Sequence, residues 1–140
     1  MLIIALVVLT AVPLSQLPAA ASCPTPYIKS SSKLVLERGA ATTLEGRAFV
    51  EGCRDSMGCS TGLGCDACRW QEPPEVPLRD VSLRLVQADR TWDLAVADAG
   101  MAENNQLGWV TWTFEVPVGA IPGPAKLVPE HGEGVRVEIG

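Results

Sequence analysis

The feature that most constrains the fold is a two-residue alternation of apolar and polar side chains. It is clearest over residues 110–117, where Val110, Trp112 and Phe114 alternate with Thr111, Thr113 and Glu115. This spacing is typical of a half-buried antiparallel strand. Turn signals separate the segments, and no window longer than ten residues carries a helical stripe. Short strands at this spacing favour an all-β sandwich or barrel. Similar apolar patterns occur at residues 34–36, 81–86, 92–97, 125–127 and 135–139.

The N-terminal segment predicts export. Residues 1–22 carry no charged side chain, and an apolar run over residues 1–14 is followed by the small residues Ala19, Ala20, Ala21 and Ser22. An apolar region followed by small residues is the pattern of a signal peptide. We therefore expect a signal peptide at 1–22, a short linker at 23–32 and one β-sandwich domain at 33–140. The expected location is extracytoplasmic.

Cys23 directly follows the predicted signal peptide. The stretch Ala20-Ala21-Ser22-Cys23 resembles the bacterial lipobox, in which small residues precede a cysteine that is lipidated at the mature N-terminus. The lipobox usually has Leu three places before the cysteine, where this chain has Ala20. Ordinary cleavage after Ala21 also fits an A-x-A-like site. The chain is therefore either a lipoprotein that contacts the membrane through Cys23, or a secreted protein.

The other four cysteines gather in one short, glycine-containing stretch of the chain. An oxidising compartment favours two structural disulfides there, and three pairings are possible. A four-cysteine zinc site is one alternative, although only Cys65 and Cys68 have the close spacing that zinc sites use in pairs. A redox Cys-x-x-Cys motif at Cys65–Cys68 is another alternative. The four predicted disulfide cysteines are Cys53, Cys59, Cys65 and Cys68.

Two short motifs carry a family resemblance. Gly46-Arg47-Ala48-Phe49 and the later Val116-Pro-Val-Gly-Ala-Ile-Pro-Gly123 resemble the "G-x-G-F" and "V-P-x-G-A-x-P-G" segments of bacterial surface immunoglobulin-like domains. Ala48 replaces the second glycine of the first motif. The resemblance covers residues from about 33 to 140. It implies an antiparallel immunoglobulin-like sandwich of about seven short strands, which serves binding, spacing or adhesion, with the disulfide-rich loop at one end.

Catalytic chemistry has few candidate residues. The formal net charge of −5 argues against nucleic-acid binding, and the one histidine, His131, lies in a stretch typical of an exposed loop. Nucleotide-binding and nucleophile-elbow motifs are absent. The carboxylates between Asp98 and Asn105 lack the alternating spacing of a calcium loop. We expect no catalytic residue, metal or cofactor.

The tryptophans supply the remaining candidates for binding. Trp92 and Trp112 lie in phase with apolar faces, so we expect them in the core. Trp109 is out of phase with Trp112, and Trp70 lies beside the cysteines, so both are candidates for a binding surface. The sequence thus predicts a non-enzymatic cell-surface module that binds an unknown protein or cell-envelope partner. The alternative is a metal-binding or thiol redox module that uses the Cys53–Cys68 loop.

Overall fold

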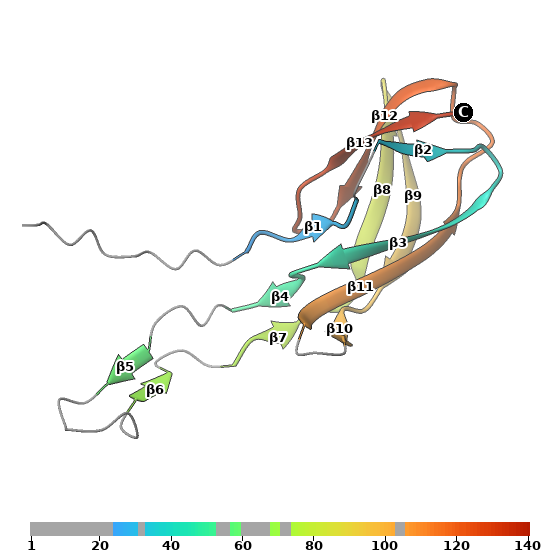
Figure 1. The fold of residues 1–140 in the computed structure, drawn as a ribbon. Coiled ribbons are helices and arrows are strands. Elements are labelled where there is room, and N and C mark those ends of the chain that lie inside the picture. The colour runs from blue at the N-terminus through green and yellow to red at the C-terminus, as the bar shows by residue number, and fades with distance from the viewer. Residues whose placement is uncertain (1–23, 31–32, 53–56, 60–67, 71–73, 103–105) are drawn as a thin grey trace, which may run out of the picture.

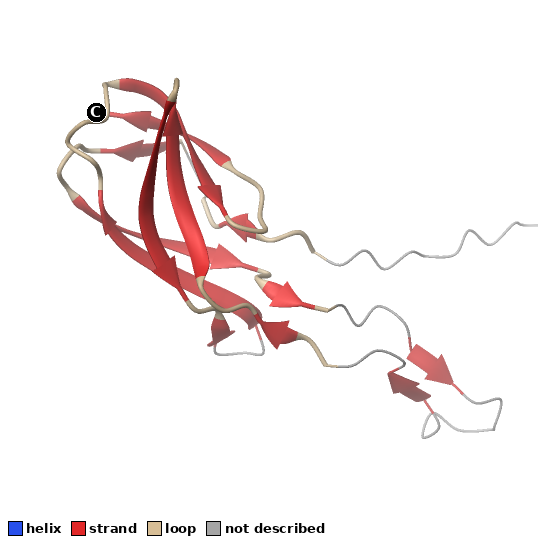
Figure 2. Ribbon diagram, turned by 180° about the vertical axis from the view of Figure 1, so that it is seen from behind, coloured by secondary structure: helices blue, strands red, loops and turns tan. Residues whose placement is uncertain are grey.

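The chain folds into strands throughout its described part. The computed structural model describes residues 24–30, 33–52, 57–59, 68–70, 74–102 and 106–140, and these ranges contain strands, turns and no helix (Figure 2). The predicted all-β class is confirmed. The strands are β1 (Tyr27–Ile28), β2 (Leu34–Leu36), β3 (Ala41–Arg47), β4 (Val50–Glu51), β5 (Met57–Cys59), β6 (Cys68–Trp70), β7 (Val76–Pro77), β8 (Val81–Gln87), β9 (Arg90–Ala97), β10 (Gly100–Ala102), β11 (Gln106–Glu115), β12 (Gly123–Pro129) and β13 (Val135–Ile139).

Two larger sheets form the two layers of a sandwich (Figure 1). The first sheet has the strand order β1-β3-β11-β10, and the second has the order β2-β13-β12-β8-β9. Neighbouring strands are antiparallel, except that β2 runs parallel to β13. Two short ribbons, β4-β7 and β5-β6, lie between β3 and β8 in the chain. The described residues contain more strands than the sequence predicts, because several of these strands are too short to show an alternation.

The core lies between the two sheets and follows the predicted alternation. On β11, Val110, Trp112 and Phe114 are buried, and on β8 the buried residues are Val81, Leu83, Leu85 and Gln87. Burying one large apolar side chain contributes about 1.5–3 kcal/mol, so these facing rows supply much of the favourable energy of folding. Trp112 is in the core as predicted, whereas Trp92 is partly buried and packs against it.

Trp112 also joins the two sheets through a polar contact. Its indole Nε1 donates a hydrogen bond of 2.9 Å to the backbone oxygen of Val81 on the opposite sheet. Phe49 packs against the indole edge-to-face, with ring centroids 5.4 Å apart and planes at 88°. A Cβ at Gly46 would lie 2.5 Å from Cε2 of Phe49. This position therefore has room only for glycine, and the Gly46-to-Phe49 motif reflects close packing.

A bulge in β11 receives the backbone of Phe49. Gly108 has a φ of +67°, which favours glycine, and the register with β10 shifts between Gly100 and Met101. The Phe49 N–H donates to the Gly108 carbonyl at 3.1 Å, and a Cβ on Gly108 would lie 2.5 Å from that nitrogen. The bulge thus brings the chain after β3 against the start of β11.

The sandwich begins before the predicted boundary. Residues 23–32 were expected to be a linker, but Tyr27 and Ile28 form β1 and pair with Arg47 and Gly46 of β3. Ile28 is only 6% exposed and belongs to the core. The local pattern does not reveal β1, because a two-residue strand is too short to show an alternation and its partner lies far away in sequence.

The segment between β3 and β8 extends from one end of the sandwich. β4 pairs with β7, and Figure 1 shows the β5-β6 hairpin farther from the two sheets. The loop between β12 and β13 lies at the same end, because Glu130 N–H donates to the Ser82 carbonyl at 2.8 Å and Glu133 N–H donates to the Pro26 carbonyl at 2.9 Å. The segment between β3 and β8 therefore leaves from the end of the sandwich where the β12–β13 loop also lies.

Candidate binding face

The outer surface of the first sheet presents aromatic, charged and hydroxyl side chains together. Because successive side chains of a strand point to opposite faces, the buried Val110 and Trp112 of β11 leave Trp109 and Thr111 facing outward. The same rule applies on β3 and after β1. We call this surface the Trp109 face, and it comprises Tyr27, Lys29, Thr43, Glu45, Arg47, Trp109, Thr111 and Thr113.

Trp109 lies against two cationic groups of this face. The guanidinium carbon of Arg47 is 3.6 Å from the Trp109 ring centroid, and the Lys29 ammonium is 5.4 Å from it. Each such contact contributes about 0.5–1 kcal/mol at an exposed site. Tyr27, which is 46% exposed, is the register partner of Arg47 on β1, the strand that flanks β3 opposite β11. Tyr27, Arg47 and Trp109 therefore form one row across three strands.

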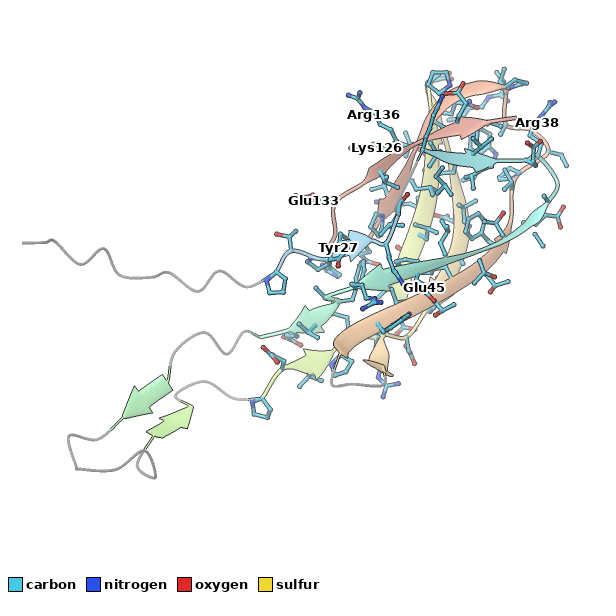
Figure 3. The ribbon with its side chains drawn as sticks, in the orientation of Figure 1. Tyr27, Arg38, Glu45, Lys126, Glu133 and Arg136 are labelled. Atoms are coloured by element: carbon cyan, nitrogen blue, oxygen red, sulfur yellow. The ribbon has the colours of Figure 1, made fainter. Side chains whose placement is uncertain are left out.

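Two further rows of this face are polar. The Lys29 ammonium lies 3.2 Å from Glu45 in an exposed ion pair, which orients Lys29 more than it stabilises the fold. The hydroxyls of Thr43 and Thr113 are hydrogen-bonded at 3.1 Å across β3 and β11. Figure 3 shows Tyr27 on β1 and Glu45 on β3, both on this side of the sandwich. The result is a nearly continuous band of groups that can hydrogen-bond or stack with a partner.

A shallow hollow opens where β1 ends. β1 pairs with β3 at Gly46 and Arg47, and the Lys29 N–H donates to the Glu45 carbonyl at 2.8 Å. Beyond that bond, no described strand pairs with this edge of β3. The hollow beside the edge is lined by Lys29, Thr43, Leu44 and Glu45. The margin of the Trp109 face is therefore concave rather than flat.

The two tryptophans predicted from the sequence have different outcomes. Trp109 is half-buried, faces away from Trp112 as expected, and contacts Arg47 in the end row of the face. Trp70 lies on β6 opposite Met57, and its side chain is outside the described part of the structure. Sequence reasoning missed Tyr27, Lys29 and Arg47. Only the pairing of three strands brings these residues together, and no local pattern signals that pairing.

The loop between β12 and β13 holds the predicted exposed histidine. His131 is exposed, has a φ of +61°, and its Nε2 lies 3.6 Å from Glu130 Oε1. Ser82 Oγ donates to Glu130 Oε2 at 3.0 Å. Hydrogen bonds from the Ser82 side chain and then its backbone hold the pKa of Glu130 below its usual value. The serine hydroxyl is thus directed to a carboxylate, and the contact fastens the loop to β8.

A second carboxylate stabilises the turn before β8. Asp98 accepts a 3.0 Å hydrogen bond from the backbone N–H of Asp80 and a 2.8 Å bond from Arg79. The Asp80 hydrogen bond first, and then the Arg79 guanidinium, lower the pKa of Asp98. Asp80 has a φ of +53°, in the left-handed region that Asp adopts more readily than most residues, and the Asp98 carboxylate holds the turn in this conformation.

Several predicted sites fall outside the described residues. These are the signal peptide, the lipidation site Cys23, and Cys53 and Cys65 of the predicted disulfides. Cys59 and Cys68 are described as strand positions of β5 and β6. Within the described ranges, no three His, Cys, Asp or Glu side chains come together in a metal-binding group. Across those same ranges, no helix has the length and apolar character needed to cross a membrane.

Comparison with known proteins finds no match to this chain, whether among protein-family models, curated proteins or solved structures.

Proposed function

We propose that the chain is an exported, non-enzymatic binding module with an immunoglobulin-like fold. It is held at the cell surface by lipid on Cys23, and it binds a protein partner through the Trp109 face. The proposal joins the signal-like N-terminus, the strand order of the sandwich and the composition of its outer surface.

The strand order supports the immunoglobulin-like assignment. In that fold, strands A, B, E and D form one sheet, and strands C, F and G form the other, with C′ added beside C in variable domains. The order β1-β3-β11-β10 corresponds to A-B-E-D, and β13-β12-β8-β9 corresponds to G-F-C-C′. β2 then continues strand A and crosses to lie parallel to strand G.

Two features depart from antibody domains. The buried tryptophan, Trp112, lies on the E-like strand, whereas antibody domains place theirs on strand C. Neither the B-like strand β3 nor the F-like strand β12 contains a cysteine, so these strands cannot form the inter-sheet disulfide of antibody domains, and both bury leucines, Leu44 and Leu127. The segment that carries the clustered cysteines corresponds to the B–C loop, which contributes to binding in variable domains.

The composition of the Trp109 face is the observation that carries the binding proposal. Tyr27, Arg47 and Trp109 stand in one row, and Trp, Tyr and Arg are the residue types that dominate binding energy at protein interfaces. The cationic contacts hold the Trp109 ring in place, so less side-chain entropy is lost when a partner binds. A protein partner at the cell surface is therefore the occupant we propose.

Site-specific crosslinking on intact cells tests the face. A photoreactive residue at Thr111, exposed on the Trp109 face, is compared with one at Thr91, exposed on β9 of the other sheet. We expect a discrete protein adduct from position 111 and none from position 91. Adding Trp109→Ala should remove the adduct, while Val96→Ala, an apolar truncation at an exposed position of β9, should leave it. Equal adducts from both positions, or an adduct insensitive to Trp109→Ala, would overturn the proposal.

Membrane partition tests the anchor separately. The full chain should fractionate with membranes and carry lipid at its mature N-terminus, and Cys23→Ala should release it to the soluble extracytoplasmic fraction. If the wild-type chain is soluble and has a free Cys23 thiol, the lipid anchor is refuted and the protein is a secreted module.

A further inference from the structure

The β5-β6 hairpin places two of the clustered cysteines directly opposite each other. β5 and β6 pair antiparallel, with Met57 opposite Trp70, Gly58 opposite Arg69, and Cys59 opposite Cys68. The Cys59–Cys68 pair is the last of this ladder before the loop that closes the hairpin. The sequence alone leaves three pairings of the four clustered cysteines open, and this register distinguishes among them.

The backbone geometry of such a pair suits a disulfide. Residues directly opposite each other in an antiparallel ladder have Cα atoms about 4.5 or 5.5 Å apart, depending on the type of pair. A disulfide needs a Cα separation of about 4.4–6.8 Å, and its two side chains must leave the same face of the sheet, as opposed residues do. Both kinds of ladder pair satisfy these conditions, so the backbone need not move.

We propose that Cys59 and Cys68 form a disulfide that closes the β5-β6 hairpin, which leaves Cys53 and Cys65 to pair with each other. The inference goes beyond the proposed function and rests on it only for the oxidising surroundings of an exported chain. A two-stranded ribbon of three residues a side is marginal in water, so a crosslink at its last pair supplies the order that apolar burial cannot.

The chemistry is a thiol–disulfide exchange with a disulfide donor. The thiolate of one cysteine attacks the donor disulfide, which forms a mixed disulfide and releases one donor thiol. The thiolate of the second cysteine then attacks the protein sulfur of the mixed disulfide and releases the second donor thiol. The two cysteines are oxidised by two electrons and give up two protons, and the donor is reduced to two thiols. Oxidised glutathione serves as the donor in the test.

Thiol mapping in the full chain tests the pairing. Every protein carries Cys23→Ala, so that only the four clustered cysteines report, and is oxidised in a glutathione buffer, unfolded and alkylated. In Cys59→Ser the orphaned thiol should be Cys68, and in the matched control Cys53→Ser it should be Cys65. Cleavage before Asp55 and Asp66 puts Cys53, Cys65 and Cys68 in three separate fragments, so the alkylated fragment identifies the orphan.

Each outcome decides the proposal. A single alkyl group on the fragment that begins at Asp66 in Cys59→Ser, together with a Cys59→Ser/Cys68→Ser double variant that has no reactive thiol, supports it. Alkylation of Cys53 or Cys65 in Cys59→Ser overturns it. Four reactive thiols in the oxidised parent chain, with or without bound zinc, also overturn it. Because the mapping uses purified protein, it is independent of the crosslinking that tests the Trp109 face.

Discussion

Ala48 is the residue at which a glycine should stabilise this protein. It follows β3 and has a φ of +65°, a left-handed conformation that costs a residue with a Cβ about 1–2 kcal/mol. The neighbouring contacts impose this conformation, because the Phe49 N–H bonds to Gly108 and the Phe49 ring packs on Trp112. Ala48 also occupies the place of a glycine in the motif that resembles bacterial surface domains.

The expected size of the Ala48→Gly effect follows from three terms. Glycine removes the left-handed cost of about 1–2 kcal/mol. It also increases the entropy of the unfolded chain, which costs about 0.4–1 kcal/mol. Loss of the half-buried methyl costs about half of the roughly 0.8 kcal/mol that full burial of such a group is worth. The net result is a stabilisation of about 0.5 kcal/mol.

Ala41→Gly is the matched control for this variant. Ala41 is the first residue of β3, the strand that Ala48 follows; it is exposed, pairs with Glu115 and is not among the residues of positive φ. Its replacement by glycine should destabilise the fold by about 0.5–1 kcal/mol. The unfolded-state entropy term is common to both variants, so the difference between them, about 1–1.5 kcal/mol, reports chiefly the left-handed cost.

Urea unfolding, followed by tryptophan fluorescence, measures both variants against the parent chain. With a slope of about 1–3 kcal/mol/M, the two midpoints should differ by roughly 0.3–1.5 M, with unchanged slopes. If Ala48→Gly lowers the midpoint as much as Ala41→Gly does, the left-handed conformation at Ala48 carries no cost and the reasoning is wrong.

Three further substitutions probe other contacts. Phe49→Ala should destabilise the fold by about 3–5 kcal/mol in urea unfolding, because it leaves a cavity beside the indole of Trp112; a loss below about 1 kcal/mol would contradict this packing. Asp98→Asn should lower the melting temperature at pH 7. Because the folded pKa of Asp98 lies below its ordinary value of 3.8, this deficit should shrink as the pH falls below that value. A deficit that does not change with pH would contradict the role of the ionised Asp98 carboxylate. Lys126 and Arg136 are exposed register partners on β12 and β13, and Figure 3 shows both at the surface. Arg136→Glu should therefore raise stability by about 0.2–1 kcal/mol at low salt, more than Arg136→Gln does, and equal effects would exclude the cross-strand charge term.

The local pattern of the chain predicted the core strands well. Trp112 and Phe114 on β11, and Leu83 and Leu85 on β8, are buried where the alternation places them. Such positions are predictable because a two-residue period maps directly onto the two faces of a strand. β1 and β10 were not predicted, because each is too short to show a period and depends on a partner distant in sequence.

The candidate face, like the strands, could be predicted from the sequence only in part. The phase of Trp109 against Trp112 was enough to place Trp109 on the outer side of β11. The contacts of Arg47 and Lys29 with its ring depend on pairing across residues far apart in the chain, which no local signal specifies. The φ of Ala48 was likewise hidden, because the sequence shows only that alanine replaces a glycine there and not that the position has a positive φ.

Phe49 links the cysteine-bearing segment to the Trp109 face. Its N–H donates to Gly108, the residue before Trp109, and its carbonyl accepts from the N–H of Leu78, the residue after β7. Both the start and the end of the segment between β3 and β8 are therefore bonded at the point where β11 begins. A substitution that displaces Phe49 should shift the Trp109 ring as well as the segment. A loss of partner binding in the Phe49→Ala variant would thus report altered geometry, whereas Trp109→Ala, which leaves the Phe49 bonds in place, reports the face itself.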